Sequence, residues 1–193
     1  MTRRRLLLRA GALGGLAAAA MTLRHGPAEA LAGTPVPPHA APPLDLVDDG
    51  GRPFDVTSLQ GRPAWVTFGY TACPDVCPTL LATLAAARDL AAAPVHIVFV
   101  TLDPAQDGPA RLRDYLAAFA DARGHAPIGL TGTAAQTARA AASWGVTWRR
   151  AGAFLDHTAQ VSFLDAEGRL RLRYGYAQAS DPAALARDAR LVA

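Results

Sequence analysis

Cys73 and Cys77 are the only cysteines in this chain of 193 residues, and they lie four positions apart in residues 71–78, TACPDVCP. The apolar run at residues 64–68 before them predicts a buried strand, and a helix is expected to begin near Cys77. Two thiols at a strand-to-helix turn can close a disulfide or bind a soft metal ion. The helix N-terminus lowers the pKa of a nearby thiol, which favours both kinds of chemistry.

The cysteine spacing leaves several roles open. Dithiol oxidoreductases use Cys-x-x-Cys, and the third intervening residue found here does not prevent a disulfide. A structural disulfide is the simplest alternative, although a domain of about 150 residues builds its core without one. A peroxidase is a weaker alternative, because no arginine stands close in sequence to Cys73. Metal binding and a redox pair are therefore the two main readings.

His157 favours the metal. It lies in residues 155–159, LDHTA, directly before a predicted strand at residues 160–164. In a thioredoxin-like fold the turn before that strand faces the cysteine loop, so His157 is expected to reach Cys73 and Cys77. Two thiolates and one imidazole suit Cu(I), and Cu(II) if a fourth ligand joins. Zinc is the rival, but a closed zinc site takes four protein ligands and no third cysteine exists.

The predicted elements alternate between strand and helix and end in a hairpin and a helix. This order predicts an α/β, thioredoxin-like fold, with a central mixed sheet flanked by helices and an added N-terminal hairpin. Strands are expected at residues 44–47, 64–68, 95–100, 160–164 and 170–174, and helices from near residue 77 to 91 and at residues 109–122, 134–144 and 182–191.

The N-terminus predicts export. Residues 1–30 combine three consecutive arginines, an apolar stretch and a small-x-small triplet at residues 28–30, as in a signal peptide, and they resemble the twin-arginine type. Retention as a membrane anchor is the alternative. Residues 31–43 are rich in proline and alanine and are expected to form a flexible linker before the domain at residues 44–193. The protein is expected in the periplasm or at the outer face of the cytoplasmic membrane.

The leader also carries the basic charge. It holds five of the 19 basic residues and one of the 16 acidic ones, which leaves 14 against 15 and a net charge of −1. This balance gives no reason to expect nucleic acid as a partner.

Four ordered motifs together resemble the Sco/SenC family of copper-binding thioredoxin-fold proteins. They are residues 68–78 with both cysteines, residues 101–104 with Asp107, the Leu-Thr-Gly at residues 130–132, and residues 156–159 with His157. The resemblance covers about residues 43–192. Ala72 stands where family members often carry histidine, and residues 144–154 look shorter than usual.

The resemblance implies that Cys73, Cys77 and His157 bind copper, and that oxidation of the two cysteines to a disulfide switches binding off. It also implies a copper chaperone that serves the copper centre of cytochrome c oxidase or another copper acceptor. A thiol–disulfide oxidoreductase acting on partner cysteines, itself served by a thioredoxin-like reductant, is the alternative. A metallochaperone is the favoured class, and enzymatic activity stays open.

Overall fold

The computed structural model describes residues 30–91, 94–152 and 154–193. Leu31–Ala193 forms one compact unit, and the fold described below is that of this unit. The expected signal peptide lies outside the described residues except for Ala30. Within the described ranges, no helix combines the length and the apolar character needed to cross a membrane.

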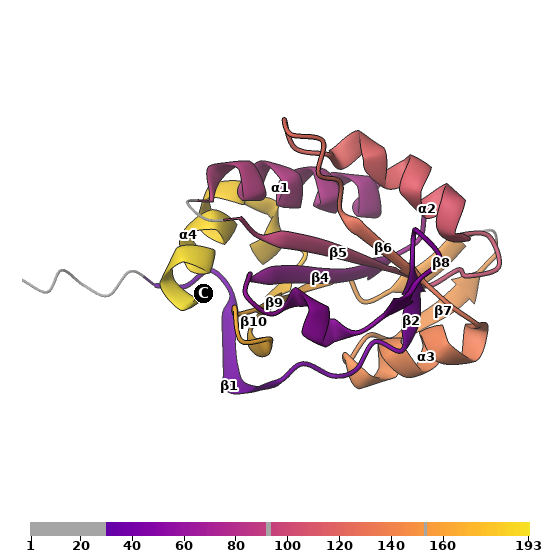
Figure 1. The fold of residues 1–193 in the computed structure, drawn as a ribbon, viewed down its shortest axis with the longest axis horizontal. Helices are drawn as coiled ribbons and strands as arrows, with labels where there is room; N and C mark the ends of the chain where they lie inside the picture. The colour runs from indigo at the N-terminus through magenta and orange to yellow at the C-terminus, as the bar shows by residue number, and fades with distance from the viewer. Residues whose placement is uncertain (1–29, 92–93, 153) are drawn as a thin grey trace, which may run out of the picture. The chain divides into compact units, whose positions relative to one another are not determined.

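A mixed eight-stranded sheet forms the centre of the unit, in the order β1-β10-β9-β4-β5-β6-β2-β3 (Figure 1). At its middle, β4 (Ala64–Gly69) pairs in parallel with β5 (His96–Thr101), which pairs in parallel with β6 (Ile128–Thr131). Every residue of β4 is buried. Burial on both faces explains why these strands are continuous apolar runs rather than alternating patterns. The predicted α/β fold, with helices around a central mixed sheet, is confirmed.

Most of the other elements lie close to their predicted positions, but no strand was predicted at residues 128–131, which form β6. The strands are β2 (Leu46–Asp48) and β3 (Pro53–Phe54), which form the expected N-terminal hairpin, and β9 (Gln160–Leu164) and β10 (Arg169–Gly175), which form the later one. The helices are α1 (Val76–Leu90), α2 (Pro109–Leu116), α3 (Ala134–Ser143) and α4 (Pro182–Val192). Short 3-10 turns occupy Val56–Leu59, Ala117–Phe119 and Gln178–Ser180.

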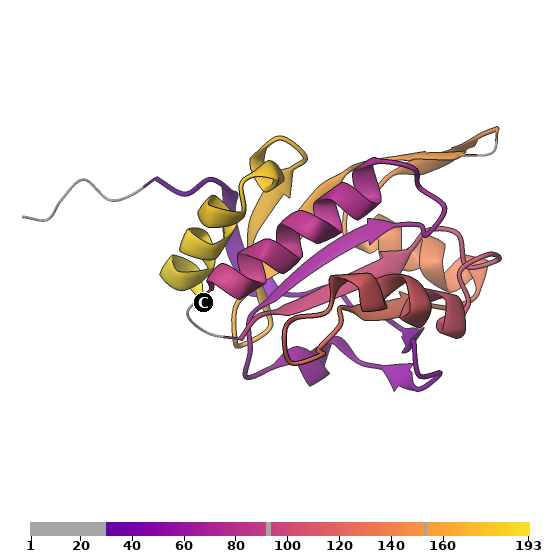
Figure 2. The same cartoon turned by 90° about the horizontal axis from the view of Figure 1, so that it is seen from above.

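The helices cover both faces of the sheet. Helices α1 and α2 lie over one face and α3 lies on the opposite side (Figures 1 and 2). Helix α1 buries Leu80, Leu81 and Leu84, whose spacing places them on one stripe of the helix. This packing fixes the first turn of α1, which carries Cys77, against the carboxyl end of β4.

The N-terminal segment differs from the linker expected at residues 31–43. Thr34–Ala40 forms β1, an edge strand that pairs antiparallel with β10 and has a register irregularity between Pro35 and His39. The prolines of this segment favour a linker in the sequence. An edge strand tolerates them, because only one side of it needs to pair with the sheet.

A third hairpin was not expected from the sequence. β7 (Trp148–Ala151) and β8 (Phe154–His157) form a separate two-stranded sheet. β7 buries no residue. Its sequence therefore lacks the alternation of apolar and polar residues that predicts a strand. This hairpin carries His157.

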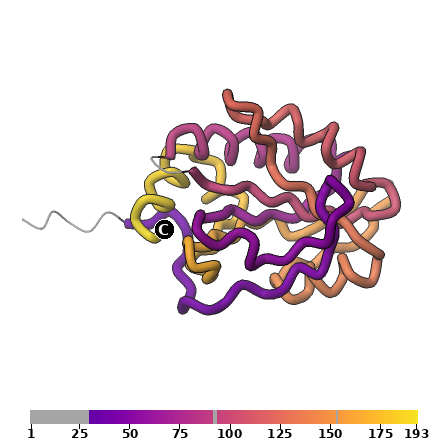
Figure 3. The backbone as a smooth tube through the Cα atoms, in the orientation of Figure 1, coloured from indigo at the N-terminus to yellow at the C-terminus, as the bar shows by residue number. Residues whose placement is uncertain are grey.

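Asp188 on α4 ties the start of the domain to its end. Its side chain is fully buried, and Oδ2 accepts hydrogen bonds from the backbone N–H groups of Ala32 and Gly33, both 2.9 Å, and from the Tyr174 hydroxyl at 3.2 Å. Figure 3 shows the start of the described chain running beside α4. The contact therefore anchors the residues that lead into the edge strand β1.

We expect Asp188→Ala to lower the free energy of unfolding by about 3 kcal/mol, because three donors lose a buried charged acceptor. Urea denaturation followed by circular dichroism measures this. Asp89→Ala is the control, since the Asp89 side chain is 60% exposed on α1 and its loss is expected to change stability by less than about 0.5 kcal/mol. Equal midpoints for the two variants would contradict the role of Asp188.

Candidate metal centre

The two cysteines lie together at the N-terminus of α1. Cys73 follows β4 in the turn that leads into the helix, where its N–H donates to the Tyr70 carbonyl at 3.2 Å. Cys77 lies in the first turn of α1, and its backbone N–H donates to the Cys73 sulfur at 3.4 Å. The Cys73 sulfur thus accepts a hydrogen bond from the helix end, while Asp75 makes no side-chain capping bond. Both thiols are free.

His157 reaches this pair from the end of β8, as predicted from its place before β9. Its Nε2 atom lies 3.6 Å from the Cys77 sulfur. Its Nδ1 atom lies 3.2 Å from the Thr158 carbonyl, and a proton on Nδ1 donates to that oxygen. The lone pair of Nε2 then faces the sulfur, which is the tautomer a metal ligand needs. The Tyr70 ring lies edge-on to the imidazole at 6.2 Å.

Burial makes the two thiols unequal. Burial raises the pKa of Cys73, but hydrogen bonds from the backbone N–H groups of Asp75 and Cys77 outweigh it, and the pKa is lowered overall. Burial raises the pKa of Cys77 far above its usual value, and the negative charge of Cys73 adds to this. Cys73 is half-buried, whereas Cys77 is 3% exposed. Cys73 therefore has the lower pKa and the greater exposure of the two thiols.

The electrostatics of His157 also suit a ligand. Burial lowers the pKa of its imidazole, and the Thr158 carbonyl and Asp156 oppose the shift only in part. A neutral imidazole at neutral pH is the form that binds metals. Asp156 itself pairs with Arg149 across the hairpin, with both side chains more than half exposed.

The spacing of two donor atoms fits a shared metal ion. Metal–sulfur and metal–nitrogen bonds of about 2.3 and 2.0 Å, meeting at roughly 110–120°, separate their donors by about 3.5–3.7 Å. The gap between Cys77 Sγ and His157 Nε2 is 3.6 Å. In the described ranges, no three His, Cys, Asp or Glu side chains already form a complete metal cage. Of the three predicted ligands, the structure therefore brings Cys77 and His157 within ligand distance of each other.

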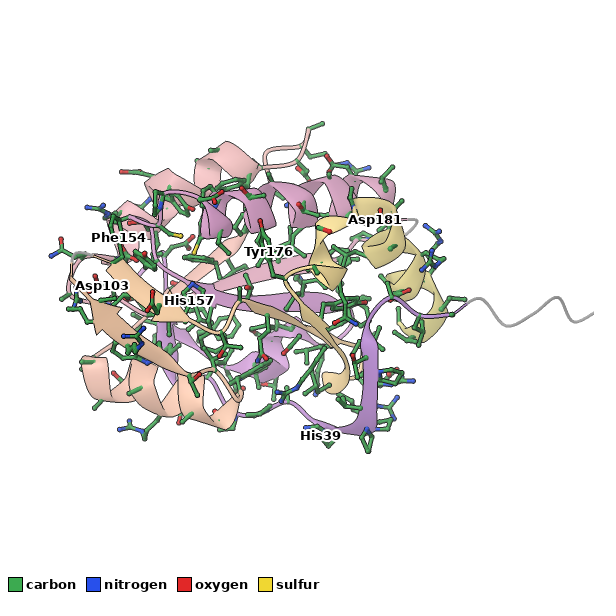
Figure 4. All side chains as sticks on the ribbon, turned by 180° about the vertical axis from the view of Figure 1, so that it is seen from behind. His39, Asp103, Phe154, His157, Tyr176 and Asp181 are labelled. Atoms are coloured by element: carbon green, nitrogen blue, oxygen red, sulfur yellow. The ribbon has the colours of Figure 1, made fainter. Side chains whose placement is uncertain are left out.

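A groove gives access to the cluster. It has a volume of about 390 Å³ and runs between the cysteine loop and β8, lined by Tyr70, Cys73, Pro74, Asp75, Val76, Phe154, Leu155, Asp156, His157 and Ala159. Figure 4 shows Phe154, His157 and Asp103 at one end of the domain, with His39 at the other. A larger cavity of about 790 Å³ lies at the opposite end of β5, beside His96, and no cysteine lines it.

The structure separates the other histidines from the site. His39 is exposed and bonds the Pro37 carbonyl. His96 is half-buried at the start of β5, where burial lowers the pKa of its ring. His125 pairs with Asp121 on the surface. Sequence reasoning assigned no role to Tyr70, whose hydroxyl accepts the N–H of Leu155 on β8 at 3.3 Å, because this contact joins residues 85 positions apart.

Three comparisons with known proteins, by family profile, by sequence and by structure, all find Sco proteins. The profile of the SCO1/SenC family matches residues 33–192. A SCO2-like protein of Rickettsia felis is 30% identical over 148 residues, which cover 71% of this chain and 69% of the relative. The copper-bound structure of Bradyrhizobium japonicum ScoI superposes with a TM-score of 0.69 at 29% identity, covering 80% of this chain and all of that one.

Two further solved structures extend the comparison. The copper-bound ScoI of Arabidopsis thaliana matches with a TM-score of 0.69 at 26% identity, over 79% of this chain and 99% of that one. The apo Sco1 protein of Thermus thermophilus matches with a TM-score of 0.72 at 28% identity, over 85% of this chain and 98% of that one.

Proposed function

This chain belongs to the SCO1/SenC family, and on that basis we propose that it binds one copper ion through Cys73, Cys77 and His157 and passes it to an acceptor protein. The observation that carries the proposal is the 3.6 Å separation of Cys77 Sγ and His157 Nε2, which are 80 residues apart in sequence. Two copper-bound relatives share the fold at 26–29% identity. Soft sulfur donors with one imidazole favour Cu(I).

The open groove beside the two cysteines and His157 suits transfer of copper to a partner protein rather than storage of copper. Cys73 is half-buried and lines the groove, so an acceptor's donor atom can approach the metal from that side. Ligand exchange then replaces one donor at a time, and copper never becomes a free ion. We propose that the acceptor is the copper centre of cytochrome c oxidase, as the family resemblance implies. The domain would act outside the cytoplasm after export.

Anaerobic titration of the reduced domain, residues 31–193, with Cu(I) against a competing chelator tests the proposal. We expect one tight equivalent in the parent protein and a loss of about 100-fold or more in affinity for Cys73→Ser and for His157→Ala. His125→Ala is the matched control, because that imidazole lies on the surface beside Asp121. Affinity that is indifferent to His157 would overturn the ligand assignment.

The unequal thiols support a second candidate function, a thiol–disulfide oxidoreductase. Cys73 has the lowered pKa and the greater exposure, and Cys77 lies buried behind it. In this reading the Cys73 thiolate attacks a partner disulfide and releases one partner thiol. Cys77 then attacks the mixed disulfide and releases the second, so the partner gains two electrons and the cysteine pair becomes a disulfide.

Incubation of the reduced domain with oxidised glutathione tests the second function. We expect two equivalents of reduced glutathione, a mixed disulfide trapped on Cys73 in Cys77→Ser, and none in Cys73→Ser. His157→Ala separates the two functions, since it removes a copper ligand but no redox-active group. Failure of the reduced protein to exchange would exclude the oxidoreductase.

A further inference from the structure

The loop between β5 and α2, residues 102–108, contacts both halves of the candidate metal centre. Building on the proposed function, we infer that this β5–α2 loop positions His157 relative to the cysteine pair. Asp107 holds the loop that carries Cys73, and Asp103 holds the hairpin that carries His157. Both aspartates are thus positioning residues rather than ligands.

Asp107 fixes the cysteine loop through Thr71, two residues before Cys73. The Asp107 side chain is fully buried, and its Oδ2 atom accepts hydrogen bonds from the Thr71 N–H at 2.9 Å and from the Thr101 hydroxyl at 2.7 Å. Its Oδ1 atom accepts the Thr71 hydroxyl. The Arg111 Nε–H donates to the same hydroxyl at 2.7 Å, so Thr71 uses both its donors and an acceptor here.

Asp103 fixes the histidine hairpin through Arg150 on β7. The Asp103 carboxylate is 11% exposed and lies 3.3 Å from the Arg150 guanidinium. Arg150 pairs with Leu155 across the hairpin, two residues before His157. Figure 4 shows Asp103 at the same end of the domain as the hairpin residues Phe154 and His157. A second tie to the body of the domain is the hydrogen bond from the Leu155 N–H to the Tyr70 hydroxyl.

The β5–α2 loop itself holds the two aspartates at a fixed distance. The N–H of Asp107 donates to the Asp103 carbonyl at 2.9 Å, as in a helical turn. The N–H of Asp103 donates to the Thr101 hydroxyl, which in turn donates to Asp107. Metal–ligand distances tolerate about 0.2 Å of error, so a rigid element that spans both ligand-bearing segments sets how well they share one ion.

Adjacent arginines on β7 provide a matched pair of variants. Arg150 reaches Asp103 outside the hairpin, whereas Arg149 pairs with Asp156 inside it. For the cysteine loop, Thr71→Val removes the hydroxyl and keeps the side-chain shape. Thr71→Ser keeps the hydroxyl and removes the methyl group. These substitutions avoid Asp107 itself, whose replacement in the core risks loss of the fold.

Amide hydrogen exchange of the reduced, metal-free domain is the first measurement. We expect Arg150→Gln to speed exchange about tenfold in residues 154–158 and to leave the amides of residues 70–77 unchanged. Thr71→Val should do the reverse, and Arg149→Gln and Thr71→Ser should match the parent protein. If neither Arg150→Gln nor Thr71→Val changes exchange in its own segment, the inference is overturned whatever copper does.

The second measurement is the Cu(I) affinity, determined by chelator competition. Arg150→Gln is expected to weaken binding about threefold to fivefold, the range of a partly exposed ion pair, and to have no further effect in a His157→Ala background. Thr71→Val should weaken binding about tenfold in both backgrounds. An Arg150→Gln loss that persists without His157 would contradict the inference. If the parent protein binds no tight copper, the proposed function fails, and the exchange measurement still decides the inference.

Discussion

Cys77→Ser is expected to abolish tight copper binding, with a loss of about 1,000-fold or more in Cu(I) affinity, because an alcohol oxygen is a poor ligand for a soft cation. Cys77 is 3% exposed and its sulfur lies 3.6 Å from His157 Nε2, so it already lies at ligand distance from the imidazole. The substitution changes one atom and leaves α1 intact. Copper titration checks the affinity, and circular dichroism checks the fold.

A control variant separates the loss of a copper ligand from a general effect of substitution in α1. Thr79→Ser, two residues further along α1, is the control, since the Thr79 side chain is exposed and lines neither the cluster nor the groove. We expect parent-like affinity from it. Copper bound equally well by Cys77→Ser would mean that the buried thiol is not a ligand.

Gly69→Ala is expected to weaken Cu(I) binding by about 30-fold or more without changing any ligand. A Cβ atom at this last residue of β4 would lie 2.7 Å from the Cys77 sulfur and 2.8 Å from the Phe99 ring. Carbon and sulfur do not approach so closely, so the Cys77 sulfur and the Phe99 ring must shift, and we expect this shift to disturb the distance between the sulfur and His157. Overpacking of this kind also costs about 1–3 kcal/mol of stability. Chelator competition and urea denaturation measure the two effects separately.

Gly108→Ala is the matched control, because a Cβ atom there meets no other atom within 4 Å. It should retain the parent affinity. If Gly69→Ala also bound copper within threefold of the parent protein, the position of the Cys77 sulfur would not matter to the site, and the ligand assignment would need revision.

The central strands and the helices could be predicted because each buries a continuous surface. β4 and β5 are mostly apolar, and Leu80, Leu81 and Leu84 repeat at helical spacing. The terminal helix could be placed as well, because Asp181 caps it and Pro182 begins it. Local sequence is enough to predict these elements, because burial and capping each require particular residue types at neighbouring positions.

The elements that the sequence did not predict owe their structure to distant partners. β1 pairs with β10, more than 120 residues away, and its prolines are typical of a linker rather than of a strand. The hairpin of β7 and β8 buries little and is joined to the domain by Arg150 and Leu155. The proximity of His157 to the cysteines could be inferred from the fold class alone. Its tautomer, the unequal thiols and the roles of Asp103 and Asp107 depend on contacts that no local pattern encodes.

X-ray absorption at the copper edge of the copper-loaded, reduced domain tests the central claim most directly. A site built from Cys73, Cys77 and His157 predicts two sulfur neighbours near 2.3 Å and one nitrogen neighbour near 2.0 Å around each copper, to about 0.2 Å. The nitrogen shell should disappear in His157→Ala and remain in His125→Ala. A first shell made only of nitrogen and oxygen, or an imidazole signal that survives His157→Ala, would contradict the account.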